Sequence, residues 1–138
     1  MKRIRRVQAG FTLIELMIVI AIIGILAGIL VPNYVKARAQ GIATACKSNL
    51  KTISTVLEMY AHDNAGRYPT ALASLNPTYL KVVPTCPSVG ATSVYINGFT
   101  SRSQPDGYTV MCSGTNHSGV GYSANYPQYS STSGLSER

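Results

Sequence analysis

Residues 5–32 read RRVQAGFTLIELMIVIAIIGILAGILVP, and this stretch decides how the rest of the chain can fold. Two arginines precede a run from Phe11 to Val31 whose only polar side chains are those of Thr12 and Glu15. A helix of this length reaches about 31 Å, which matches the hydrocarbon core of a bilayer. The run therefore predicts a membrane-spanning helix over residues 11–33. A plain signal anchor would look similar, but it gives no reason for a carboxylate, which is costly in hydrocarbon.

The positive charge of the chain is concentrated before the apolar run. The formal net charge is +7, and the early contribution comes from Lys2, Arg3, Arg5 and Arg6. Because basic residues beside a membrane helix tend to stay on the cytoplasmic side, we expect a cytoplasmic N-terminus and a head outside the cytoplasm. The basic balance is thus a property of the N-terminal segment and says little about nucleic acid.

A second helical pattern follows Pro32. Apolar residues recur every three or four positions and trace one helix face, made of Ile42, Cys46, Leu50, Ile53, Leu57 and Tyr60. The side chains expected to contact water are those of Lys47, Lys51, Ser54 and Glu58. We therefore expect an amphipathic helix over residues 34–66, ended by Gly66 and Pro69. It should continue the apolar helix with a kink or local loosening at Pro32, which removes a backbone hydrogen bond.

Residues 67–138 have the composition of a small head built from turns and short strands. YPTALASL at residues 68–75 has room for a helical turn, and prolines punctuate the connection that follows. We expect antiparallel strands at Val94–Gly98 and Tyr108–Cys112, joined through the turn region 105–107. The polar C-terminus is expected to be loose. The predicted fold class is α+β, with a long N-terminal helix packed on a head that holds a short antiparallel sheet.

The sequence offers no arrangement expected of an enzyme or a metal protein. Neither His62 nor His117 stands in a recognisable relation to a cysteine nucleophile, and no phosphate-binding glycine motif appears. Cys46, Cys86 and Cys112 with His62 or His117 would give a mixed metal site, but they lack the closely spaced pair typical of structural zinc. We therefore expect no catalytic residues, no metal and no cofactor. Three cysteines fit one disulfide and one free thiol, and the residues alone leave the connectivity open. Cys46 is either a buried apolar residue of the helix face or a partner in that bridge.

The segment AGFTLIELMIVIAIIGILAGILVPNY resembles the N-terminus of type IV prepilins and of the related pseudopilins of type II secretion. A short basic leader ends at Gly10, Phe11 follows, and the apolar helix carries Glu15 and then Pro32. The resemblance implies a pilin-like fold and removal of residues 1–10 by a membrane-embedded prepilin peptidase. It also implies N-methylation of the new Phe11 amine, with the helix kept in the mature protein.

The resemblance also suggests a function for the Glu15 carboxylate within the apolar run. In a filament, the Glu15 carboxylate can pair with the Phe11 amine of a neighbouring subunit. Low dielectric strengthens that attraction and penalises any packing that leaves Glu15 alone, so the charge would select one axial stagger. The alternative is that Glu15 reaches the membrane interface and has no specific partner.

The partners implied by the resemblance are those of an assembling membrane subunit. They are the prepilin peptidase, identical or related pilin subunits, the lipid bilayer, and an inner-membrane assembly platform with its ATPase motor. The subunit would first be a single-pass inner-membrane protein and then part of a filament. The main hypothesis is a structural subunit of a type IV pilus on the cell surface. A minor pilin that binds DNA or a surface is an alternative, although binding to nucleic acid is not favoured.

A pseudopilin of a periplasmic type II secretion filament is the other alternative. LEMYAHDNAGRYPTALASLNPTYLKVVPTCP, at residues 57–87, is similar to the major pseudopilins of type II secretion. Those proteins carry an acidic calcium loop, whereas the acids of this chain after residue 100 are Asp106 and Glu137. Type IV pilins often close the C-terminal loop with a disulfide instead, and on that resemblance we expect Cys86 and Cys112 to be bonded.

The resemblance predicts a defined mature N-terminus. Intact-mass measurement of the functional protein should give a chain that begins at Phe11 and carries one added methyl group. Replacing Gly10 with a bulky residue should block cleavage, because the peptidase would no longer fit the bond, and should leave the precursor in the membrane. A functional form that retains Met1 would contradict this expectation.

Overall fold

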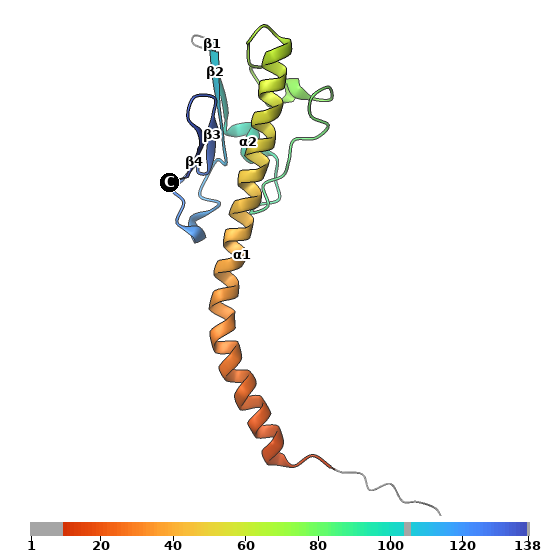
Figure 1. The fold of residues 1–138 in the computed structure, drawn as a ribbon, viewed down its shortest axis with the longest axis vertical. Coiled ribbons are helices and arrows are strands. Elements are labelled where there is room, and N and C mark those ends of the chain that lie inside the picture. The colour runs from red at the N-terminus through yellow and green to blue at the C-terminus, as the bar shows by residue number, and fades with distance from the viewer. Residues whose placement is uncertain (1–9, 104–105, 138) are drawn as a thin grey trace, which may run out of the picture. The chain divides into compact units, whose positions relative to one another are not determined.

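A computed structural model describes residues 10–103 and 106–137 of the chain (Figure 1). In chain order the elements are α1 (Leu13–Asp63), the 3-10 helix η1 (Leu72–Leu75), α2 (Ser93–Asn97), β1 (Phe99–Ser103), β2 (Asp106–Met111), the 3-10 helix η2 (Ser118–Val120), β3 (Gln128–Ser130) and β4 (Gly134–Ser136). The chain divides into two compact units, Met1–Val35 and Lys36–Arg138, and α1 contributes to both. The expected α+β class, with a long N-terminal helix and a small antiparallel sheet, is confirmed.

The C-terminal end of α1 follows from the local sequence. The helix contains Pro32 and continues to Asp63, so the kink expected at the proline stays a prediction. After Asp63 the backbone turns left-handed at Ala65 and Gly66, with φ values of 55° and 81°. The Gly66 N–H donates to the carbonyl of Ala61 at 2.8 Å, which closes the helix in the manner of a Schellman turn.

The core of the head forms on one face of the second part of α1. The buried helix residues are Ala43, Cys46, Leu50, Ile53, Ser54, Val56, Leu57 and Ala61. Five of them, Cys46, Leu50, Ile53, Val56 and Leu57, share a cluster with buried residues of the head, namely Leu72, Leu75, Cys86, Val94, Tyr95, Tyr108, Val110 and Cys112. The predicted apolar face is thus confirmed in its central part, whereas Ile42 and Tyr60 at its two ends are half-buried.

Ser54 corrects the predicted polar side of the helix. It was expected to contact water, but only 4% of it is exposed. Its Oγ lies 2.6 Å from the Oη of Tyr108. The Tyr108 hydroxyl in turn donates to Oε1 of Glu58 at 3.1 Å. Burial and the Glu58 carboxylate raise the pKa of Tyr108, so the hydroxyl keeps the proton that it donates. Helical spacing could not reveal this, because the partner of the buried serine comes from a distant strand.

The four strands form one antiparallel sheet in the order β1-β2-β3-β4, which lies beside the second part of α1 (Figure 1). β2 confirms the strand predicted at Tyr108–Cys112, and its alternating Tyr108 and Val110 side chains are buried in the core. The turn predicted at residues 105–107, between the strands expected at Val94–Gly98 and Tyr108–Cys112, is wrong for Asp106 and Gly107, which belong to β2 and pair with β1. Pro105 lies outside the described residues. The helical turn expected within residues 68–75 is confirmed as η1.

The strand predicted at Val94–Gly98 is wrong. These residues form α2 and the glycine that ends it, and Val94 and Tyr95 are both buried. Two buried neighbours in sequence fit one side of a helical turn, whereas a strand would point them to opposite faces. The β-branched and aromatic residues of this segment misled the prediction, because their packing against the core outweighs their preference for strands.

The other strands gave little signal in the sequence. β1 reads FTSRS and is too polar to stand out, yet it pairs with β2 along its whole length, from Phe99 opposite Val110 to Ser103 opposite Asp106. The C-terminal residues expected to be loose instead form β3 and β4. Tyr129 of β3 pairs with Val110 and packs against the core. The sheet therefore includes most of the polar tail.

At the junction between α2 and β1, the backbone of Gly98 lies close to the backbone of Met111. A Cβ at this position would collide with the carbonyl oxygen of Met111, whose N–H donates to the carbonyl of Gly98 at 3.0 Å. Gly98→Ala should therefore lower the free energy of unfolding by about 1–3 kcal/mol, as overpacking does. The measurement is denaturant unfolding of the full chain in detergent, followed by the near-UV signal of its tyrosines.

The matched control is Gly41→Ala. Gly41 is an exposed helix residue with nothing within 4 Å of an added Cβ, so alanine should stabilise the helix by about 0.5–1 kcal/mol. Equal stability of Gly98→Ala and the wild type would contradict the close approach of the two backbones.

Candidate functional site

The first part of α1 is apolar on all sides. Its exposed large side chains are Leu13, Ile14, Leu16, Met17, Ile18, Val19, Ile20, Ile22, Ile23, Ile25, Leu26, Ile29, Leu30, Val31, Tyr34 and Val35. None of the described residues in its most apolar 18-residue window is buried, and its length and composition allow it to cross a membrane. Such a surface requires lipid or other apolar helices as its neighbours.

Thr12 and Glu15 form a capping box at the start of α1. Oε2 of Glu15 accepts hydrogen bonds from the Thr12 backbone N–H at 2.8 Å and from the Thr12 hydroxyl at 2.7 Å. In return, the Glu15 N–H donates to Oγ1 of Thr12 at 3.3 Å. The pair satisfies backbone donors that a helix start leaves without partners. The Glu15 carboxylate, which is costly in an apolar run, thus caps the helix within a single chain.

This capping box was missed in the sequence, although its signal was present. Thr12-x-x-Glu15 before an apolar run is the usual pattern of a helix N-terminus. It was overlooked because Glu15 was considered only as a charge in hydrocarbon. Both residues lie after the expected cleavage point, so the same bonds remain available in the mature chain.

The expected cleavage point lies just before the helix. Gly10 and Phe11 precede α1 and are exposed, with 83% of Phe11 accessible. An exposed, non-helical peptide bond is one that a peptidase can bind in extended form. The leader residues 1–9 lie outside the described residues, and the cleavage and methylation stay predictions.

A second group of reactive side chains gathers inside the head. The sulfur atoms of Cys46, Cys86 and Cys112 and a ring nitrogen of His117 all lie within 4.8 Å of one another, and all four residues are buried. The Cys86 and Cys112 sulfurs are 3.6 Å apart, and the Cys112 sulfur is 3.3 Å from Nε2 of His117. Four separate positions in the sequence thus converge on one point of the core.

The protonation of this group follows from burial and mutual contact. A hydrogen bond between Cys112 and Cys46 raises the pKa of Cys112 and lowers that of Cys46. Burial raises the pKa of Cys86 and lowers that of His117, so the imidazole is neutral at pH 7. The cluster therefore combines thiols with a neutral imidazole whose nitrogen lone pair can bind a proton or a cation.

The disulfide expected between Cys86 and Cys112 stays a prediction. The two sulfurs are neighbours, but all three cysteines of the described chain are free thiols. Cys46, whose pairing the sequence left open, joins them from α1, and His117 completes the group, whereas His62, the other histidine considered with the cysteines, is not part of it. Spacing rules compare residues that are close in sequence, whereas these ligand atoms meet only through the tertiary fold.

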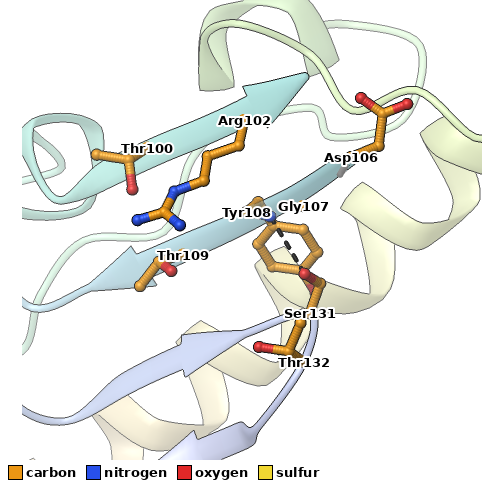
Figure 2. Close-up of a pocket in the computed structure, with 8 residues that line it drawn as sticks. All are labelled: Thr100, Arg102, Asp106, Gly107, Tyr108, Thr109, Ser131 and Thr132. Atoms are coloured by element: carbon orange, nitrogen blue, oxygen red, sulfur yellow. Dashed lines mark hydrogen bonds between the residues drawn. The ribbon is translucent and has the colours of Figure 1, made fainter. Parts of the chain in front are cut away.

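The outer face of the sheet carries a polar pocket of about 340 Å³ (Figure 2). Its lining residues are Thr100, Arg102, Asp106, Gly107, Tyr108, Thr109, Ser131 and Thr132. The Tyr108 N–H donates to Oγ of Ser131 at 3.2 Å, which holds the β3–β4 turn region against β2. Hydroxyls and one charge of each sign line the pocket among these described residues. They offer a hydrated surface rather than a nucleophile with a positioned base.

Comparison with known proteins places the chain in a family. Residues 5–31 match the model of the prokaryotic N-terminal methylation motif. The chain is 38% identical over 111 residues to the type IV wide pilus major component PilA4 of Thermus thermophilus, which covers 80% of this chain and 84% of that protein. The chain belongs to the type IV pilin and pseudopilin family. Its relatives are structural components, and as a member of this family it is a pilus or pseudopilus subunit.

Other members of the pilin family match shorter stretches of the chain. The type II secretion system core protein G of Pseudomonas aeruginosa is 44% identical over 71 residues, which is 51% of this chain and 49% of that protein. The type IV major pilin protein PilA of Myxococcus xanthus is 53% identical over 51 residues, or 37% of this chain and 23% of that protein. The chain thus spans about half the length of the secretion protein it matches. No solved structure shows a significant match.

The capping box of this pilin-family helix can be tested in isolation from assembly. Thr12→Ala removes the hydroxyl that donates to the Glu15 carboxylate and accepts from the Glu15 backbone N–H. The first turn of α1 should therefore lose about 1 kcal/mol of stability. Amide hydrogen exchange at Glu15 should become faster in the full chain in detergent. Glu15→Gln keeps an oxygen that can accept from Thr12 and should retain most of the protection. Unchanged exchange in Thr12→Ala would contradict the capping bonds.

Proposed function

We propose that the chain is a structural subunit of a type IV pilus-like filament. The observation that carries this proposal is the apolar, exposed first part of α1 with a carboxylate in its first turn. The subunit is held in the inner membrane by this segment, with its N-terminus in the cytoplasm and its head outside. Prepilin peptidase cleaves it between Gly10 and Phe11 and methylates the new amine. An assembly platform with an ATPase motor then adds it to a filament.

Assembly exchanges one apolar environment for another. In the bilayer the first part of α1 contacts lipid tails, which are as apolar as its own side chains, so helix burial alone gives little preference for a partner. In a filament outside the membrane, the same surface is covered by the helices of neighbouring subunits. Close packing then favours association but selects no axial position along so uniform a surface. A polar contact is needed to fix the stagger.

Glu15 is placed to supply that contact. Within the described residues, both hydrogen bonds from Thr12 end on Oε2, which leaves Oε1 able to accept from a neighbouring subunit. After cleavage, the amine of Phe11 becomes a cation near the start of the helix. Pairing it with Oε1 of the next subunit satisfies two charges that would each be costly alone in an apolar bundle. The capping box holds the carboxylate in place for this pairing.

The coverage of the relatives favours a pilus over a secretion pseudopilus. The match to the Thermus pilus component covers 80% of this chain and 84% of that protein, whereas the match to the Pseudomonas secretion protein covers about half of each chain. The acids available for a calcium loop are also few. Glu137 already contacts Nζ of Lys47 and the hydroxyl of Tyr122, each at 2.9 Å, so Asp106 remains alone. The pseudopilin is the second candidate, favoured by the higher identity of the Pseudomonas secretion protein over a shorter matched stretch.

The decisive variant is Glu15→Gln, because it keeps the cap and removes the charge. It should insert and be processed like the wild type, but the yield of sheared filaments should fall about tenfold or more. A loss of only 1.4 kcal/mol per contact changes an association constant tenfold. The measurement is the ratio of sheared filament to membrane-inserted subunit at equal expression.

Two controls separate charge from shape in this experiment. Thr12→Ala weakens the cap but keeps the carboxylate, so it should assemble better than Glu15→Gln. Ile22→Leu preserves apolar volume and should assemble nearly as the wild type. Normal filament yield from Glu15→Gln would contradict the role given to the charge.

A further inference from the structure

The cysteine and histidine cluster has no part in assembly through α1, and its geometry is close to that of a metal centre. In a tetrahedral zinc site, bonds of about 2.3 Å to sulfur place neighbouring sulfurs about 3.8 Å apart. The Cys86 and Cys112 sulfurs are 3.6 Å apart, and Nε2 of His117 is 3.3 Å from the Cys112 sulfur. With Cys46 included, the four ligand atoms span at most 4.8 Å. Small side-chain movements would bring all four ligand atoms to bonding distance from one ion.

Two of the three sulfurs also receive hydrogen bonds from neighbouring side chains. The Tyr95 hydroxyl donates to the Cys46 sulfur at 3.1 Å, and Nδ2 of Asn116 lies 3.6 Å from the Cys112 sulfur. Cysteines that serve as small apolar core residues have no need of such donors. Metal-bound thiolates do, because their charge must be stabilised inside the protein.

The loops that carry the ligands are braced by bonds of their own. The Ser88 hydroxyl donates to the carbonyl of Asn116 at 2.7 Å and ties the two ligand loops together. Asn125 holds the second loop from outside, since its N–H donates to the Gly114 carbonyl at 2.7 Å and its Oδ1 accepts from the Gly114 N–H at 2.9 Å. The ligand positions are therefore fixed by the fold before any ion is considered.

We propose that Cys46, Cys86, Cys112 and His117 bind one Zn²⁺ as a structural site in the head. Three thiolates and an imidazole suit Zn²⁺, whereas Ca²⁺ and Mg²⁺ require oxygen ligands. Four protein ligands leave no open position for a substrate, so the ion would stabilise rather than catalyse. It would connect α1 to the loop after η1 and to the end of β2, and so join the main parts of a small core. A disulfide between Cys86 and Cys112 would exclude it.

The test uses the full chain in detergent. After isolation, metal analysis and non-denaturing mass measurement should find one Zn²⁺ per chain and three reduced cysteines. Exchange with Co²⁺ should give the visible absorption of a tetrahedral site and the near-UV charge-transfer band of bound thiolates. A native protein whose mass is lower by two hydrogens, with Cys86 bonded to Cys112, would overturn the proposal. So would reduced protein that binds no Zn²⁺ when the ion is added.

Variants assign the ligands. His117→Ala should lose Zn²⁺, while His117→Cys should keep it and intensify the Co²⁺ charge-transfer band through a fourth thiolate. His62→Ala is the matched control, because His62 is exposed at the end of α1 and should bind Zn²⁺ as the wild type does. Equal binding by His117→Ala and His62→Ala would overturn the assignment.

Tyr95→Phe tests the second layer without opening a cavity. It keeps the buried ring and removes the hydroxyl that donates to Cys46, so Zn²⁺ affinity should fall roughly 10- to 100-fold. Near-UV circular dichroism of the tyrosines would show that the head remains folded. Unchanged affinity in this folded variant would contradict a thiolate at Cys46.

Discussion

An apolar helix surface that its own chain leaves exposed must be covered by something other than water, and the first part of α1 is such a surface. The second part of the same helix meets the requirement internally, because the head packs over its apolar face. The second part of α1 is thus covered by the chain's own head, whereas the first part needs a partner from outside the chain. We propose that lipid covers the first part of α1 before assembly and that neighbouring subunits cover it in a filament.

Glu15 makes this arrangement specific. Within one subunit it caps the helix through Thr12, and between subunits it is proposed to pair with the Phe11 amine. The two functions are compatible, because the capping bonds occupy one carboxylate oxygen and leave the other. A residue that first appears as a cost in the membrane therefore contributes to helix formation before assembly and to subunit stagger afterwards.

The sequence predicted those features that depend on periodicity and failed on those that depend on distant contacts. The long helix, its buried stripe at Cys46, Leu50, Ile53 and Leu57, and strand β2 all follow from local spacing. Burial of Ser54 depends on a tyrosine from β2. The strands β1, β3 and β4 are short, mostly polar segments that pair with their neighbours and place few residues, such as Phe99 and Tyr129, against the core. Sequence spacing argued against a metal site at Cys46, Cys86, Cys112 and His117 for the same reason, since only the tertiary fold brings these residues together.

The central claim is that the exposed first part of α1 assembles into a filament and that Glu15 fixes the axial position of each subunit. A high-resolution structure of sheared filaments tests this claim most directly. The account predicts filaments built from this chain, starting at a methylated Phe11, with each Glu15 carboxylate at hydrogen-bonding distance from the Phe11 amine of a neighbouring subunit. Filaments in which Glu15 contacts only its own Thr12, or surface filaments that do not contain this chain, would contradict the account.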